Sequence, residues 1–259
     1  MPSRKKNKKG TKGLTKAPFI VGIVLYPGFD LLDVAGMNEV WTFVDASLAG
    51  RPIKVITVAA DNELAALAPL TVKPSCTFAD DPKIDLLFVP GAGDGLTEAI
   101  KDATLHQFLR RKAKRATYVT SVCTGALVLA AAGLLDGYQA TCHWSVIDCL
   151  KLFPDVTVVN GFPRYLRDRN RFTGGGISSS IDEALFMVQQ VVTDLTGEAS
   201  NGDAACQRVQ LAIQYNPDPP FRGGDPASVA FSVFEPVEEP GMREFRAAVC
   251  KAVREHIGG

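Results

Sequence analysis

The chain has 259 residues, of which 46% are hydrophobic and 22% are charged, and its 28 basic residues balance its 28 acidic ones. These proportions are ordinary for a soluble globular protein. Apolar runs such as Leu86–Val89 and Leu127–Leu135 are much shorter than the roughly 20 residues that span a bilayer, so no membrane segment is predicted.

The first 18 residues differ from the rest of the chain. They contain seven basic residues and no acidic one, and the remainder carries 21 basic and 28 acidic residues, a net charge of −7. We expect a disordered basic tail over 1–18 and a single domain with a C-terminal helical extension over 19–259. The tail lacks the apolar core of a secretory signal, which predicts a cytoplasmic protein. Its lysines are typical of a nucleic-acid-binding arm or a nuclear address, and the alternative is a solvated extension with no part in the chemistry. The acidic remainder of the chain argues against nucleic acid as the main ligand.

Strand-like and helix-like patterns alternate after the tail. Apolar runs typical of buried strands cover Phe19–Tyr26, Ile53–Ala59, Ile84–Val89 and Thr117–Ser121, with Val156–Val159 and Tyr165–Arg167 as further candidates. Helical patterns cover Asp33–Val44, Leu96–Arg115, Gly125–Gly133, Ile181–Leu195, Ala204–Tyr215 and Met242–Ile257. This alternation predicts an α/β fold with a mostly parallel sheet covered by helices on both faces.

Cys123 lies at a strand-to-helix turn, where ligands bind in such folds. The arrangement resembles the nucleophile elbow of hydrolases, and the helix N-terminus favours a thiolate there. The alternative is a buried cysteine that packs as a small apolar residue. The small polar neighbours Thr120, Ser121 and Thr124 favour a functional role.

Two other strand ends carry candidate groups. The turn Gly91-Ala92-Gly93 after Pro90 offers backbone N–H donors for an oxyanion site, or is a simple turn. Asp33 follows the first strand and is either a helix N-cap or an acid/base partner of Cys123. Asp30 is the competing carboxylate, and its neighbours predict exposure in a turn.

The remaining cysteines and histidines have no metal-binding spacing, and the chain has no P-loop or G-x-G-x-x-G motif, so neither a metal nor a cofactor is predicted. We expect the cysteines to be reduced, with packing roles for Cys142, Cys149, Cys206 and Cys250. For His143, a hydrogen-bonded structural role is favoured over that of a base. Asp182 and Glu183 each follow a serine by three residues, as in a capping box.

Several segments together resemble the ThiJ/PfpI superfamily, which has the class I glutamine amidotransferase-like fold, and within it the isocyanide hydratase (isonitrile hydratase) branch. The segments are Leu32-Asp33, Val119–Leu129, Ala131–Leu135, Thr141–Trp144, Phe172–Ile177 with Ile181-Asp182, Gln207–Leu211, Tyr215–Pro217 and Pro219–Phe221.

The resemblance implies a flavodoxin-like three-layer sandwich and a homodimer that hydrates R–N≡C to an N-substituted formamide without a cofactor. Cys123 would be the nucleophile and Asp33 its acid/base partner. Thr124 would hold charge and position water, and substrate would contact the residues Gly91, Ala92, Gly93, Gly176 and Ile177.

Two positions depart from the superfamily pattern. Thr124 follows the cysteine where protease-like and glyoxalase-like members have histidine, which argues against those activities. Ala92 stands where relatives commonly have glycine, and its methyl group narrows the approach to the backbone. The alternatives to isocyanide hydration are attack on another small electrophile and a cysteine redox sensor.

Overall fold

The computed structural model describes residues 16–62, 64–65, 70–224 and 240–259. The expected disordered tail lies outside the described residues except for its last three positions. Among the described helices, none is long and apolar enough to cross a membrane.

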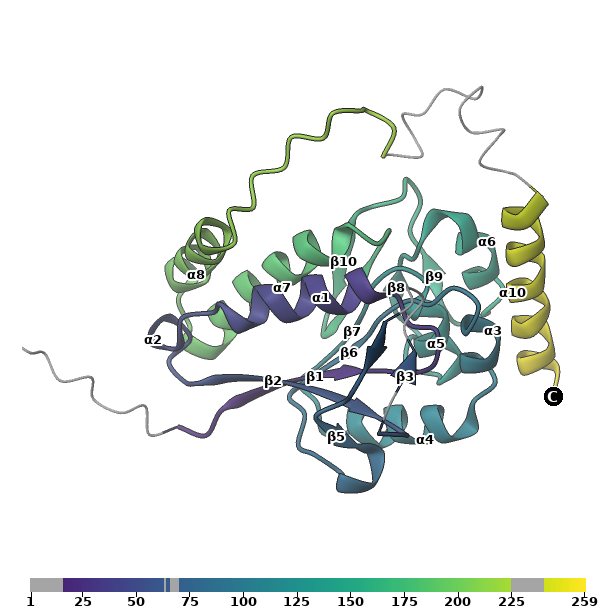
Figure 1. Ribbon diagram of the computed structural model, residues 1–259, viewed down its shortest axis with the longest axis horizontal. Helices are drawn as coiled ribbons and strands as arrows, with labels where there is room; N and C mark the ends of the chain where they lie inside the picture. Colours follow the sequence, from purple (N-terminus) through teal and green to yellow (C-terminus); the bar gives the residue numbers. More distant parts are fainter. Residues whose placement is uncertain (1–15, 63, 66–69, 225–239) are drawn as a thin grey trace, which may run out of the picture.

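The centre of the protein is a seven-stranded sheet with the order β10-β11-β7-β6-β1-β2-β5 (Figure 1). All neighbours in it are parallel except β10 and β11, which pair antiparallel at one edge. The strands are β1 Phe19–Val24, β2 Ile53–Ala59, β5 Cys76–Thr77, β6 Leu86–Val89, β7 Tyr118–Ser121, β10 Tyr165–Asp168 and β11 Arg171–Gly174. The predicted mostly parallel sheet is therefore confirmed.

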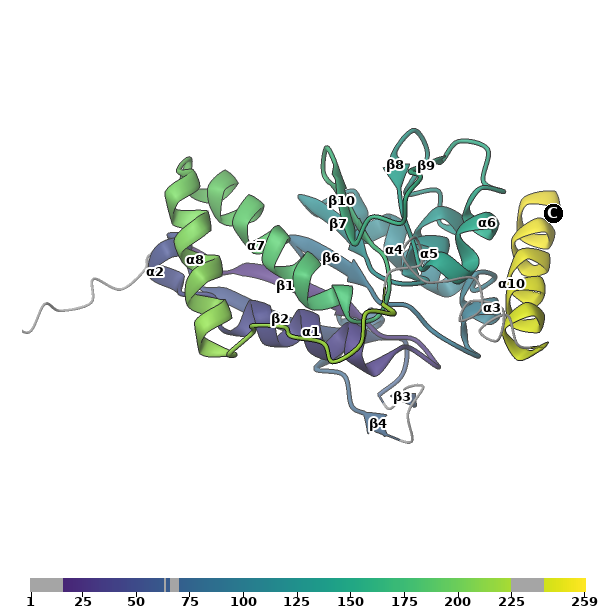
Figure 2. The same ribbon diagram turned by 90° about the horizontal axis from the view of Figure 1, so that it is seen from above.

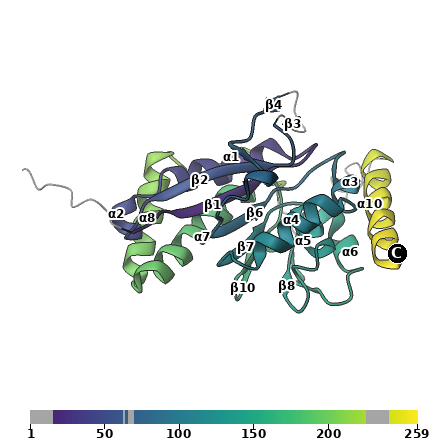
Figure 3. The same ribbon diagram turned by 90° about the horizontal axis from the view of Figure 1, so that it is seen from below.

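Helices cover both faces of this sheet. One face carries α1 (Leu31–Thr42) and α7 (Ser179–Thr196), with α8 (Ala199–Ala212) packed against α7 and the short α2 (Ala46–Ala49) (Figure 2). The other face carries α3 (Leu96–Ala99), α4 (Ala103–Ala113), α5 (Gly125–Ala131), α6 (Ile147–Leu150) and the C-terminal α10 (Pro240–Gly258) (Figure 3). This is the expected three-layer α/β sandwich.

The sequence of β1 explains why it is an interior strand of the sheet. All six of its residues are buried, as expected for a strand with helices on both sides. Val21 and Ile23 contribute to the core under α1 and α7, whereas Ile20 and Val24 contribute to the core on the opposite face. Alternation of side chains along an apolar strand thus supplies both cores.

Of the short elements around the sheet, one is a predicted strand and the others are not predicted. The candidate strand at 156–159 is β9 (Thr157–Val158), which pairs with β8 (Gln139–Ala140) in a separate sheet. A hairpin of β3 (Leu64–Ala65) and β4 (Thr71–Val72) forms a third sheet. The single-turn 3₁₀ helices are η1 (Phe78–Asp80) and η2 (Trp144–Val146).

The expectation that Cys149 and Cys250 are reduced packing residues is wrong. They form a disulfide with a Cα–Cα distance of 4.8 Å across 101 residues of sequence. The bond joins α10 to α6, and Figure 1 shows these two helices side by side at one end of the molecule. Of the cysteines, Cys76, Cys123, Cys142 and Cys206 are free.

Candidate active site

Cys123 lies on the predicted strand-to-helix turn. β7 ends at Ser121, the Val122 N–H donates to the Val89 carbonyl across the sheet at 3.3 Å, and α5 begins at Gly125. Cys123 has a backbone φ of 57°, a left-handed conformation that residues other than glycine rarely adopt. A strained backbone at a candidate nucleophile is typical of functional sites.

Asp33 is held beside this turn by a backbone hydrogen bond. Its side chain is fully buried, and its Oδ2 accepts the Gly91 N–H at 2.7 Å. Asp30, not Asp33, is the N-cap of α1, because its Oδ1 accepts the Leu32 N–H at 3.0 Å. The prediction that Asp30 is exposed is wrong: its N–H donates to the Gly91 carbonyl, and only 8% of the residue is accessible.

The loop after β6 packs directly against the cysteine. A Cβ atom at Gly91 would lie 2.7 Å from the Cys123 Cβ, so only glycine allows this approach. The Thr124 Oγ1 accepts the Ala92 N–H at 2.8 Å and donates to the Ala92 carbonyl at 3.0 Å. The N–H groups of Gly91 and Ala92 therefore hydrogen-bond to two side chains of the site, Asp33 and Thr124. Gly93 contributes its carbonyl, which accepts the Leu96 N–H.

The electrostatics of the site differ from the sequence-based expectation of a thiolate. Burial, followed by the negative charge of Asp33, raises the pKa of the Cys123 thiol well above its ordinary value, although a backbone hydrogen bond from Thr124 opposes this. Burial and the charge of Asp30 also raise the pKa of Asp33 well above its usual range. The surroundings of the site thus favour a protonated thiol at Cys123, with the buried carboxyl group of Asp33 nearby.

His143 is next to Cys123 and is held by hydrogen bonds, as predicted. Its N–H donates to the Cys123 carbonyl at 3.0 Å, and its Nδ1 is 2.7 Å from the Ser145 Oγ. Burial lowers the pKa of His143 to about 4, which keeps the ring neutral. A Cβ at Gly176 would lie 3.6 Å from His143 Cδ2, so Gly176 is also close to this group. Ile177 next to it is partly accessible.

Sequence reasoning missed two polar groups near the site. The Tyr26 hydroxyl donates to the Pro90 carbonyl at 2.6 Å, and burial and then Asp33 raise the pKa of Tyr26 well above its usual value. Glu183 is fully buried on α7. The capping-box explanation for this acid is wrong, because no side-chain cap hydrogen bond forms at the start of α7.

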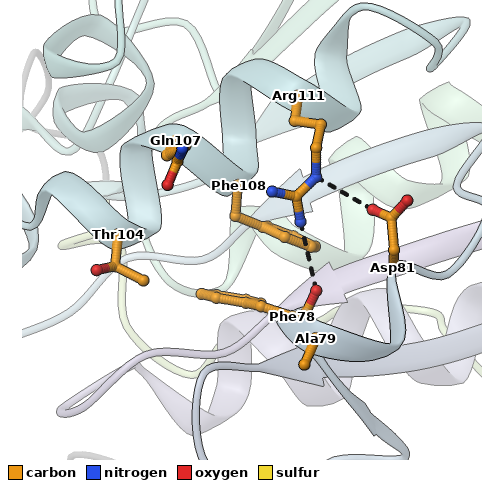
Figure 4. Close-up of a pocket in the computed structure, with 7 residues that line it drawn as sticks. All are labelled: Phe78, Ala79, Asp81, Thr104, Gln107, Phe108 and Arg111. Carbon is orange, nitrogen blue, oxygen red and sulfur yellow. Dashed lines mark hydrogen bonds and ion pairs between the residues drawn. The ribbon is translucent and has the colours of Figure 1, made fainter.

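A separate surface depression of about 510 Å³ lies between η1 and α4, away from Cys123 (Figure 4). The guanidinium of Arg111 there is already bound to Asp81 and to the Phe78 carbonyl. Within the described residues, no group of three or more His, Cys, Asp or Glu side chains is placed to hold a metal ion.

Comparison with known proteins identifies relatives of this chain. A profile of the DJ-1/PfpI family matches residues 23–190. The chain belongs to this family. Within the DJ-1/PfpI family it is 39% identical to the isonitrile hydratase of Pseudomonas putida over 222 residues, which cover 83% of this chain and 86% of that enzyme.

Three further proteins are also similar to this chain. A ThiJ/PfpI family protein from Pseudomonas syringae has a crystal structure that superposes with a TM-score of 0.79 at 31% identity, covering 98% of this chain and 97% of that one. The HTH-type transcriptional regulator GbdR of Pseudomonas aeruginosa is 29% identical over 69% of this chain, which spans about half (48%) of that regulator. Drosophila melanogaster DJ-1beta shares the fold at 18% identity and a TM-score of 0.62, covering 78% of this chain and 100% of that one.

Proposed function

We propose that this protein is an isocyanide hydratase that converts R–N≡C and water to R–NH–CHO. The observation that carries the proposal is the Asp33 carboxyl group, buried and oriented by the Gly91 N–H next to a cysteine on a strained strand-to-helix turn. The similarity to an isonitrile hydratase over most of both chains supports the same chemistry.

The reaction follows from a thiol beside a carboxylate. As the Cys123 sulfur bonds to the isocyanide carbon, Asp33 accepts the thiol proton and passes it to that carbon, which gives R–N=CH–S–Cys123. Water then adds to the thioimidate carbon, and Asp33 transfers a water proton to nitrogen. The C–S bond breaks, the hydroxyl proton returns to sulfur, and the formamide leaves.

The backbone around Cys123 supports this cycle. The Thr124 N–H, which already hydrogen-bonds to the Cys123 side chain, would stabilise negative charge on sulfur. The loop at Gly91–Gly93 keeps Asp33 and Thr124 in place through its two N–H groups. Gly176 and Ile177, at the accessible side next to His143, would contact the substituent on nitrogen.

The test is formamide production from an aromatic isocyanide, followed by ultraviolet absorbance. We expect product from wild type and from Cys76→Ala, which removes a different free cysteine, and at least a roughly 10³-fold loss in Cys123→Ala and Asp33→Asn. Full activity in either site variant would refute the mechanism. No product from folded wild type would refute the isocyanide as substrate and direct the search to other small electrophiles.

A cysteine redox sensor is the competing function, since regulators are among the relatives. Only 5% of Cys123 is accessible, and its raised pKa disfavours the thiolate that peroxide attacks. We therefore expect slow oxidation of Cys123 by dilute hydrogen peroxide, measured by mass spectrometry. Rapid, reversible oxidation without hydratase turnover would favour the sensor.

We further propose that the protein acts as a cytoplasmic homodimer, in line with the family resemblance. Exposed apolar side chains at Leu32, Phe162 and Tyr165 are available for contacts between copies. Light scattering should then give twice the 27.8 kDa mass of one chain. A monomer at micromolar concentration would contradict this.

A further inference from the structure

A second buried carboxyl group, Glu183, lies on the same side of the sheet as Asp33. It is fully buried on α7, and neither of its oxygens has a hydrogen-bond partner among the described residues. Burial and then the charge of Asp33 raise its pKa well above the usual range. Burying an isolated ionised carboxylate is costly, so the surroundings of Glu183 favour the neutral carboxylic acid.

The position of this acid is fixed against the end of β11 and the cysteine turn. A Cβ at Gly174 would overlap the Glu183 Oε2, so the carboxyl group occupies the space above that glycine. The same Cβ would lie 2.9 Å from Cγ2 of Val122, which directly precedes Cys123. The Glu183 carboxyl group therefore lies at the end of β11, close to Val122.

Contacts between α1 and α7 bring Glu183 toward Asp33. The Ser180 hydroxyl donates to the Leu32 carbonyl at 3.3 Å, and α1 lies so close at Gly36 that a Cβ there would overlap the same hydroxyl. Asp33 follows Leu32 directly, and Glu183 lies one helical turn beyond Ser180. Both fully buried acids thus lie near the place where α1 and α7 are in contact.

The two acids differ in their partners. Asp33 receives the Gly91 N–H on Oδ2, which stabilises its ionised form, but its buried Oδ1 has no partner among the described residues. By contrast, neither buried oxygen of Glu183 has a hydrogen-bond partner among the described residues. Of the two acids, only Asp33 has a partner that favours its ionised form, whereas Glu183 has none among the described residues.

We propose that Glu183 is a positioning residue whose protonated carboxyl group donates a hydrogen bond toward the free Oδ1 of Asp33 and holds that carboxylate ready for proton transfer with Cys123. The inference rests on the proposed function for its kinetic readout. The other titratable groups facing Asp33 are Asp30, Tyr26 and Cys123, and none of them donates to Oδ1.

The experiment compares Glu183→Gln, which keeps a neutral donor, with Glu183→Leu, which removes it. The acidic limb of the pH profile of kcat/KM reports ionisation of Asp33. We expect a limb near the wild-type position in the Gln variant. In the Leu variant it should move up by about one pH unit, with kcat/KM below the limb reduced about tenfold, because the carboxylate loses a hydrogen bond that favours its charged form. Asp182→Asn, on the exposed pair with Arg164, is the neighbouring control.

An unshifted limb in Glu183→Leu, or equal shifts in both variants, would overturn the proposal. Infrared spectroscopy supplies a readout that does not need turnover: a carbonyl band of a protonated carboxyl group at neutral pH should be present in Cys123→Ala and absent in Glu183→Gln. If the isocyanide is not a substrate, the band still tests Glu183. Its absence from folded wild type would refute the neutral acid.

Discussion

The two helical layers of this protein differ in how their buried groups affect stability. The layer of α1 and α7 contains two buried acids, Asp33 and Glu183, with carboxyl oxygens that lack protein partners among the described residues. The layer on the opposite face is joined by the disulfide between Cys149 and Cys250, with the ion pair of Lys101 and Glu255 at its surface. The layer that contains the candidate active site thus buries carboxyl groups at a cost in stability, whereas a disulfide stabilises the opposite layer.

The largest expected effect is a loss of stability when the disulfide of the second layer is removed. Replacing both Cys149 and Cys250 by serine should lower the free energy of unfolding by roughly 4 kcal/mol, because the bond closes a loop of 101 residues. Urea unfolding with and without reductant measures this, and Cys206→Ser is the control for a free cysteine. Turnover at 25 °C should be unchanged. A double variant as stable as oxidised wild type would contradict the reinforcing role.

A smaller effect should appear in the reactive layer as lost activity. In Gly91→Ala the new methyl group would lie 2.7 Å from the Cys123 Cβ and 2.8 Å from the Thr124 nitrogen, so the loop must shift. We expect kcat/KM to fall about 100-fold, as for other small misplacements of catalytic groups. Gly223→Ala meets nothing within 4 Å and should behave as wild type. Equal activity in the two variants would mean that the loop does not position the site.

The smallest expected effect is a pH dependence of stability from the buried acids. Both Asp33 and Glu183 have folded-state pKa values above the unfolded values of about 4. At a pH between the unfolded and folded values, the folded state therefore binds more protons than the unfolded state. Their contribution is fully favourable below about pH 4 and is lost as pH rises through the folded pKa values. Glu183→Gln should therefore be more stable than wild type at pH 8 by about 1 kcal/mol.

Urea unfolding of wild type and Glu183→Gln at pH 5 and pH 8 checks this slope. Asp182→Asn changes a charge at the partly exposed pair with Arg164 and should leave the slope as in wild type. A Gln variant that loses stability at pH 8 would mean that Glu183 is ionised and paired.

Local pattern was sufficient for the elements and for part of the site. The range Ile53–Ala59 is β2 as predicted, and the placement of Cys123 between β7 and α5 follows from an apolar strand run next to a small-residue helix. The burial of Glu183 had a signal in the sequence, since it shares the apolar stripe of α7 with Ala184 and Met187. An acid on such a stripe indicates a buried carboxyl group.

Other features depend on contacts between distant segments, which one sequence does not reveal. The pairing of Cys149 with Cys250 depends on the packing of α10 against α6, about 100 residues apart in the sequence. The burial of Asp30 depends on the Gly91 carbonyl, which accepts its N–H from a loop about 60 residues away. The raised pKa of Cys123 likewise depends on how completely the surrounding segments cover it, and this outweighs the helix N-terminus.

The bond between Cys149 and Cys250 also determines what happens to a broken chain. A single cut at any peptide bond between these residues, including the long segment after Tyr215, yields two pieces that remain covalently joined. Such a nicked protein would keep α10 attached and run as one species on a gel until a reductant separated its pieces. The last helix can therefore be retained even when the chain leading to it is not intact.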